Sequence, residues 1–147
     1  MSNIILSSYL INEIELIEKV QRRFTKSLRG FNNLSYGSRL ARLGLCTLEL
    51  RRLHFDLVFC YKIVFGLVHD VNCDDFFTFA TVANTRGHDY KLYNPTALVT
   101  YVKKFFTDRV INVWNSLPST VNFTSLMAFR RSLNNVDFGS HIHCRLE

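Results

Sequence analysis

Basic side chains gather in the first third of the chain, and their type and spacing suggest a chemical role. Between Lys19 and Arg52 the sequence holds nine Lys or Arg residues and one acidic residue, Glu49, so nine minus one gives +8 in 34 residues. The whole chain of 147 residues carries +6, so the remainder is slightly acidic. The nine cations are Lys19, Arg22, Arg23, Lys26, Arg29, Arg39, Arg42, Arg51 and Arg52.

This pattern predicts binding to the phosphates of a nucleic acid. The planar fork of an arginine can donate two hydrogen bonds to one phosphate. On a helix, Lys19 to Arg29 would cover about 15 Å, which leaves room for roughly two or three phosphates of a strand. The predicted nucleic-acid-binding residues are Lys19, Arg22, Arg23, Lys26, Arg29, Arg39 and Arg42.

A solvated, ion-paired surface is the alternative interpretation of the same residues. Glu15 with Lys19 and Glu18 with Arg22 have the i, i+4 spacing of helical ion pairs. Such spacing gives no acidic partner to the other predicted cations, for which phosphate contact and an idle surface both stay open. These are Arg23, Lys26, Arg29, Arg39 and Arg42.

Other reactive residue types do not form a recognisable site. His141, His143 and Cys144 place three metal-binding side chains in four residues, but zinc sites need a fourth ligand and a wider spacing. No Ser or Cys can be matched to a base, and no Gly-rich phosphate loop is present. Trp114 lies on an apolar helical stripe and is assigned to the core. We therefore predict no metal and no cofactor.

The cysteines and the N-terminus bear on the compartment. Cys46, Cys60, Cys73 and Cys144 form no CxxC pair and no disulfide framework. The first ten residues, MSNIILSSYL, have no basic residue ahead of a short apolar run, which argues against a secretory signal. We expect an intracellular protein with free thiols.

The most apolar stretch runs from Leu48 to Val68. Its apolar residues point round every face of a helix, so we expect a helix that is covered on all sides and forms the centre of the fold. The uncharged part is too short for a membrane span, and Lys62 falls inside it. We predict no membrane association.

Four further segments complete a mainly α prediction of four to five helices packed around the central helix. Leu10 to Leu28 is amphipathic, with Leu10, Ile14, Ile17, Val20, Phe24 and Leu28 on the packing face and the cations opposite. Ser38 would cap a short helix that Gly44 ends, Thr47 would cap the central helix, and Thr124 would cap the last helix. Leu98 to Leu117 is a strong amphipathic helix. Residues 78–95 form a loop or a short strand pair, residues 1–136 one domain, and 137–147 a loose tail.

Three stretches resemble, in order and spacing, the region after the reverse transcriptase domain of non-LTR (LINE-type, jockey-like) retrotransposon polyproteins. They are IELIEKVQRRFTK (Ile14 to Lys26), LARLGLCTLELRRLHFDLVFCYKI (Leu40 to Ile63) and FFTDRVINVWNSLP (Phe105 to Pro118). Shorter pieces agree, namely DDFF (Asp74 to Phe77), TRGHDYKL (Thr85 to Leu92) and SLMAFRRSL (Ser125 to Leu133). The resemblance implies a fragment of the thumb and post-thumb region of an RNA-directed DNA polymerase.

The resemblance also implies that the fragment is not catalytic by itself. Polymerases need carboxylates that hold two metal ions about 4 Å apart. In the family these come from an aromatic-x-Asp-Asp hairpin and a partner Asp upstream of the matched region. Asp74-Asp75 follows Asn72-Cys73 and has no partner strand, so we interpret it as a helix cap or loop pair.

Two functions of different classes follow from these observations. The first is binding of RNA or an RNA/DNA duplex through the basic segment. The second is a helical interaction or structural module that docks on an absent palm domain, with the charge serving only solubility. An independent enzyme is the least favoured reading because no residues can be named for it.

Overall fold

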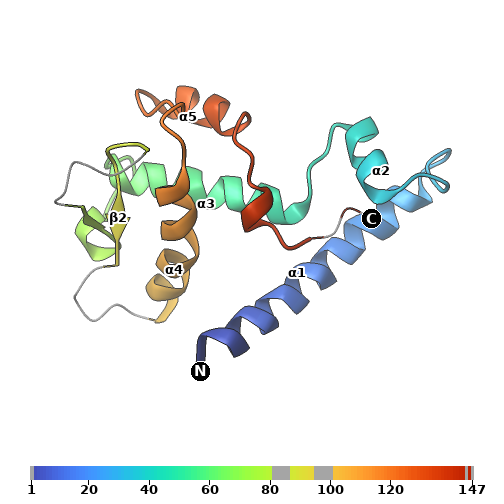
Figure 1. Cartoon of the computed structure of the whole chain (residues 1–147), viewed down its shortest axis with the longest axis horizontal. Helices are drawn as coiled ribbons and strands as arrows, with labels where there is room; N and C mark the ends of the chain where they lie inside the picture. The colour runs from blue at the N-terminus through green and yellow to red at the C-terminus, as the bar shows by residue number, and fades with distance from the viewer. Residues whose placement is uncertain (1, 81–86, 95–100, 145, 147) are drawn as a thin grey trace. The chain divides into compact units, whose positions relative to one another are not determined.

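The computed structural model describes residues 2–80, 87–94, 101–144 and 146, with the backbone alone at 2–11 and 101–105. Within this part of the chain there are five α-helices, two short 3-10 helices and one two-stranded antiparallel sheet, which confirms the mainly α prediction (Figure 1). The α-helices are α1 (Ser2–Ser27), α2 (Tyr36–Leu43), α3 (Leu48–Val64), α4 (Tyr101–Ser116) and α5 (Leu126–Leu133). The others are η1 (Cys73–Asp75), η2 (Gly139–His141), β1 (Thr78–Phe79) and β2 (Leu92–Tyr93).

The chain divides into two compact units, whereas the sequence predicted one domain over 1–136 and a loose tail over 137–147. The first unit comprises Met1–Arg52 with Phe138–Glu147, and the second comprises Leu53–Asp137. Cys144 is buried in the first unit against Tyr36 and Leu40. The Glu49 carboxylate accepts hydrogen bonds from the backbone N–H groups of His143 and Cys144, at 3.0 and 2.7 Å. These contacts hold His143 and Cys144 against α2 and the first turn of α3.

Helix ends follow the local capping chemistry, with two shifts from the predicted positions. The hydroxyl of Ser35, not Ser38, caps α2, and the hydroxyl of Ser125, not Thr124, caps α5. Gly44 ends α2 at φ 64°, and the Thr47 hydroxyl accepts a hydrogen bond from the Leu50 N–H at 3.1 Å, as predicted. In both helices, the capping hydroxyl accepts a hydrogen bond from the backbone N–H three residues further along the chain.

The apolar helix α3 ends at Val64 rather than at Val68, because Gly66 adopts φ 64° and stops it. Its Leu57, Cys60, Tyr61 and Ile63 are buried. On another face, however, Phe55 is 66% and Phe59 is 41% exposed. The expectation of a helix covered on all sides is therefore wrong for the described structure, and α3 contributes one packed face.

Aromatic rings fill the core of the second unit. Trp114 of α4 and Phe129 of α5 are fully buried, with ring centroids 5.7 Å apart. Phe123 contacts both rings, and its carbonyl accepts a hydrogen bond from the Tyr61 hydroxyl at 2.9 Å. Tilted and edge-on contacts at such distances stabilise beyond the area they bury. This cluster joins α3, α4 and α5.

The C-terminal end of α4 holds β2 in place beside it (Figure 1). The Asn115 amide donates to the Leu92 carbonyl at 2.7 Å, and its oxygen accepts from the Leu92 N–H at 2.9 Å. Its side chain thus replaces a neighbouring strand for one residue. The Trp114 indole N–H donates to the Tyr90 carbonyl at 2.6 Å. β2 then pairs with β1 through Phe79 opposite Leu92, so the strand pair predicted within 78–95 is present.

Parts of two predictions fall outside the described residues. The helix expected from Leu98 is described from Tyr101 onward, since residues 98–100 lie outside the described structure, as do the side chains of Val102 and Phe105. The same holds for residues 81–86 and for Pro95 in the expected loop. Within the described part of α4, Arg109 forms a two-fold ion pair with Asp56 of α3, at 2.8 and 2.9 Å. This planar pairing fixes the rotation of the two helices about their axes.

Replacing Asn115 by Ala should destabilise the second unit. The change leaves the N–H and C=O of Leu92, a residue that is fully buried, without their side-chain partner. We expect a loss of about 1–3 kcal/mol in the free energy of unfolding, measured by urea denaturation. Asn112→Ala, at an exposed position of the same helix, is the matched control and should change little. Equal effects of the two variants would contradict the role of Asn115.

The second unit should also lose stability on acidification. His88 is buried; it accepts the Tyr90 N–H at Nδ1 (3.1 Å), so Nε2 carries the proton that binds the Trp114 carbonyl (2.8 Å). Burial lowers the pKa of His88 below its usual value of about 6.5. Between the two pKa values the unfolded chain binds more protons, so stability rises with pH and falls as the pH drops below about 6.5.

Unfolding by urea at a series of pH values checks this expectation. His88→Gln should flatten the stability profile between about pH 7 and pH 5, whereas the exposed His69→Gln should leave its slope unchanged. His54, whose pKa burial also lowers, contributes a residual slope of the same sign. A profile as steep in His88→Gln as in the unmodified protein would show that the imidazole is not responsible.

Candidate nucleic-acid interface

Helix α1 packs through a polar face and leaves apolar side chains in solvent, which reverses the predicted packing face. Glu18 and Thr25 are fully buried. Ile17, Val20 and Phe24 of the predicted packing stripe are 53%, 69% and 62% exposed. The stripe members Ile14 and Leu28 are half-buried, and the side chain of Leu10 lies outside the described structure. Compared with the prediction, α1 is rotated about its axis, so that its polar side packs on the rest of the first unit.

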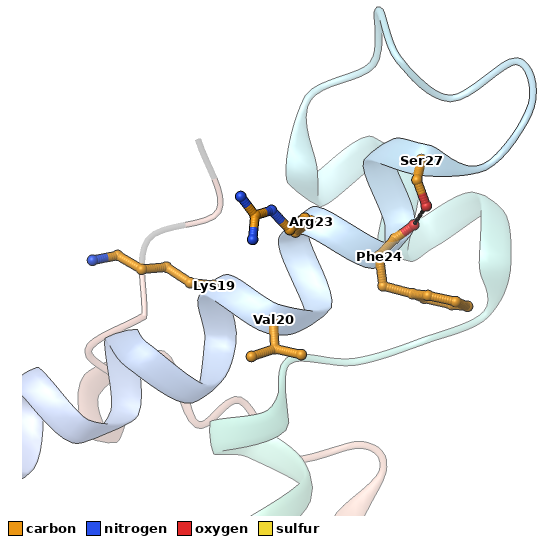
Figure 2. A pocket seen from close by; sticks show the side chains of 5 residues that line it. All are labelled: Lys19, Val20, Arg23, Phe24 and Ser27. Atoms are coloured by element: carbon orange, nitrogen blue, oxygen red, sulfur yellow. Dashed lines mark hydrogen bonds between the residues drawn. The ribbon is translucent and has the colours of Figure 1, made fainter.

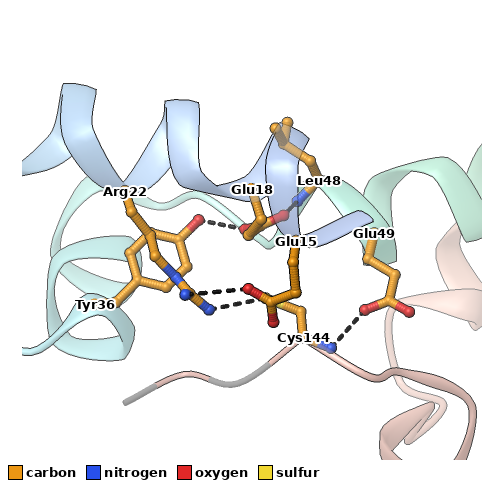
Figure 3. A network of polar contacts seen from close by, with 7 residues as sticks. All are labelled: Glu15, Glu18, Arg22, Tyr36, Leu48, Glu49 and Cys144. Carbon is orange, nitrogen blue, oxygen red and sulfur yellow. Dashed lines mark hydrogen bonds and ion pairs between the residues drawn. The ribbon is translucent and has the colours of Figure 1, made fainter. Parts of the chain in front are cut away.

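The buried carboxylate of Glu18 explains this orientation (Figure 3). It accepts hydrogen bonds from the Tyr36 hydroxyl of α2 and, at 2.9 Å, from the Leu48 N–H at the start of α3. The Gln21 amide donates to the Tyr36 hydroxyl and to the Cys46 carbonyl, both at 3.0 Å. Buried polar groups are stable only when satisfied in this way. Burial and the Glu18 hydrogen bond raise the pKa of Tyr36 well above its usual value.

Two of the seven predicted binding residues are used inside the first unit. The Arg22 guanidinium lies 3.4 Å from a Glu15 oxygen, 3.5 Å from the Cys144 sulfur, and over the Tyr36 ring. Arg39, which the sequence left without a partner, is buried: it donates to the Thr25 hydroxyl at 3.2 Å and to the Leu34 carbonyl at 2.6 Å. Both guanidinium groups therefore stabilise the packing of α1 on α2.

The other five predicted residues are exposed to solvent in the first unit. They are Lys19, Arg23, Lys26, Arg29 and Arg42. Figure 2 shows Lys19 and Arg23 projecting from the same side of α1. The rise of an α-helix places Lys19 and Lys26 about 10 Å apart along the axis. Arg42 of α2 lies over the Phe31 ring at 5.7 Å, which orients its charge without neutralising it.

An open hollow runs along α1 beside these cations. It is lined by Lys19, Val20, Arg23, Phe24 and Ser27 (Figure 2). Val20 and Phe24 project from the part of the helix surface next to Lys19 and Arg23. The described lining of the hollow therefore combines two apolar side chains with two cationic ones.

The potential metal ligands near the C-terminus and the Asp74-Asp75 pair do not form a metal site in the described structure. The backbone N–H and Nδ1 of His143 lie 3.0 and 3.2 Å from a Glu49 oxygen, and the Cys144 sulfur accepts from Arg22. Asp74 and Asp75 are exposed within η1. Across the described residues, no three His, Cys, Asp or Glu side chains are arranged to hold a metal ion. None of the described helices has both the length and the apolar character needed to cross a bilayer.

Sequence reasoning missed the residues that build this surface. Glu18, Gln21 and Thr25 recur at the three- and four-residue spacing of one helix face, beside the apolar stripe. That spacing was a usable signal, but polar residues are placed on the solvent side by default. Their partners, Tyr36 and the Leu48 N–H, could not be found from the spacing alone.

The chain matches no protein-family model, no curated protein and no solved structure.

Replacing Glu18 by Ala should destabilise the first unit. The change leaves the Tyr36 hydroxyl with one fewer acceptor and the Leu48 N–H without its carboxylate. We expect a loss of about 1–3 kcal/mol in the free energy of unfolding. Glu13→Ala, at an exposed site of the same helix, is the control. Thermal unfolding measures both variants, and a Glu18→Ala protein as stable as the control would refute the role of this carboxylate.

Proposed function

We propose that the first unit binds the phosphate backbone of RNA or an RNA/DNA duplex through its exposed cations. The observation that carries the proposal is that five of seven predicted residues are exposed on α1, α2 and the turn between them. They are Lys19, Arg23, Lys26, Arg29 and Arg42. Each phosphate contact releases condensed counterions, so affinity from such a surface is independent of sequence and falls with salt.

The position of the internal arginines supports a rigid binding surface. Arg39 is buried beneath α1, and Arg22 stacks on Tyr36, so both hold the backbone that carries the exposed cations. A surface whose side chains start from a fixed helix loses less entropy on binding than a flexible basic tail. Arg22 and Arg39 are therefore assigned a positioning role in the proposed site.

We further propose, from the sequence resemblance, that the chain is a non-catalytic fragment of a non-LTR retrotransposon reverse transcriptase. The stretch FFTDRVINVWNSLP, one of those that carry the resemblance, supplies contacts that tie the second unit together. Arg109 pairs with Asp56, Trp114 fills the aromatic core, and Asn115 holds β2. The motif thus has a folding role that does not require a catalytic domain.

A second candidate function is docking on another protein surface, such as an absent palm domain. The specific observation in its favour is the exposed apolar row on α1: Leu16, Ile17, Val20 and Phe24 are each more than half exposed. Contiguous patches of exposed apolar side chains mark interaction surfaces in monomeric proteins. Such a row adds nothing to phosphate binding.

Charge-neutral variants test the nucleic-acid proposal. Arg23→Gln with Lys26→Gln should weaken binding of an RNA/DNA duplex and lower the slope of log affinity against log salt by about 0.9 per lost phosphate contact. Arg130→Gln with Arg131→Gln, exposed on α5, removes the same charge elsewhere and should change the slope little. Filter binding at several salt concentrations measures both. Undetectable binding at low salt, or equal effects of the two pairs, would refute the proposal.

A further inference from the structure

Three sectors divide the described side chains of α1 (residues 12–27), and their hydrogen bonds to the rest of the first unit come from one sector. The residues of α1 follow at 100° steps, which places Glu18, Gln21 and Thr25 on the packed sector. Next to it lies the basic sector with Lys19, Arg23 and Lys26, and then the exposed apolar row. The apolar row therefore has the cations along one edge only, and its other edge meets the packed sector.

This one-sided arrangement restricts the chemistry of a partner. A helix lying in a bilayer surface keeps basic residues on its free polar face while its apolar face enters the lipid. Here the face opposite the apolar row is packed against α2 and the start of α3. A nucleic-acid backbone, for its part, has no apolar group to cover Val20 and Phe24.

An amphipathic helix with an acidic edge satisfies both sectors together. Its apolar residues would cover Val20 and Phe24, which are one turn apart, as in helix-in-groove recognition. Carboxylates one turn apart along its edge would face Lys19 and Arg23, like the flanking charges of a coiled coil. Glu13, exposed at the N-terminal end of the row, would repel such a partner and restrict it to the hollow between Lys19 and Ser27.

We propose that the hollow on α1 lined by Lys19, Val20, Arg23, Phe24 and Ser27 binds an acidic amphipathic helix of another protein. This inference rests on the second candidate function and names its partner class. Burial of the two apolar side chains supplies affinity, and the two cations select the acidic edge and set the orientation.

The experiment uses the full chain and a designed peptide helix with leucines on one face and glutamates along one edge. A second peptide carries lysines in place of the glutamates. In a fluorescence anisotropy titration, we expect the glutamate peptide to bind and the lysine peptide not to bind. Val20→Ser with Phe24→Ser should weaken this binding by about tenfold or more while leaving RNA/DNA duplex binding unchanged. Thermal unfolding checks that this variant remains folded.

A charge exchange tests the acidic edge separately from folding. The variant Lys19→Glu with Arg23→Glu should no longer bind the glutamate peptide and should bind the lysine peptide instead. Equal binding of both peptides, or binding that is unchanged in Val20→Ser with Phe24→Ser, would overturn the proposal. Binding of the lysine peptide alone would overturn the acidic partner while keeping a docking face. Binding of neither peptide, with duplex binding intact, would overturn the docking function and spare the nucleic-acid proposal.

Two further measurements separate the competing occupants. Tighter binding to phosphatidylserine vesicles than to either peptide, lost in Val20→Ser with Phe24→Ser, would assign the surface to an anionic membrane. Self-association of the chain alone, lost in the same variant, would assign it to a second copy. Either result would overturn the acidic-helix proposal, whereas a monomeric protein that does not bind the vesicles supports it.

Discussion

The buried Glu18 carboxylate is the constraint on which the first unit depends. Removing a carboxylate from water is costly unless hydrogen bonds replace its hydration, and here α2 and the start of α3 both supply donors. Because these donors come from separate segments, satisfying one side chain fixes the rotation of α1 about its axis. That rotation turns Val20 and Phe24 outward and sets the cations beside them.

Polar recognition also sets the arrangement of the second unit, at the end of α4. Aromatic rings fill the core of this unit, but apolar packing alone tolerates alternative rotations and registers. Asn115 and the Asp56–Arg109 pair are directional, so they select one position for β2 and one for α4 against α3. The two units thus use the same device: an apolar or mixed interface whose geometry is fixed by a few well-paired polar groups.

The two functional candidates for α1 share Lys19 and Arg23 and otherwise use different sectors of one helix. Phosphate binding needs only exposed charge on a rigid support, which Arg39 beneath the helix helps to provide. Docking needs exposed apolar area, which the inverted packing of α1 creates. Lys19 and Arg23 belong to the basic sector and also line the hollow, so a protein partner on the hollow and a polyanion on the basic sector would compete for these two side chains.

The sequence alone determined the mainly helical architecture, the Thr47 and Gly44 helix ends, and the concentration of charge in the first third, because these follow from local periodicity, capping and composition. It could not determine which face of α1 is packed, since apolar residues are expected inside and the partners of Glu18 are 18 and 30 residues away. Only the tertiary structure decided that Arg22 and Arg39 point inward while Arg23 and Lys26 stay exposed, because that choice depends on donors and acceptors brought together by folding.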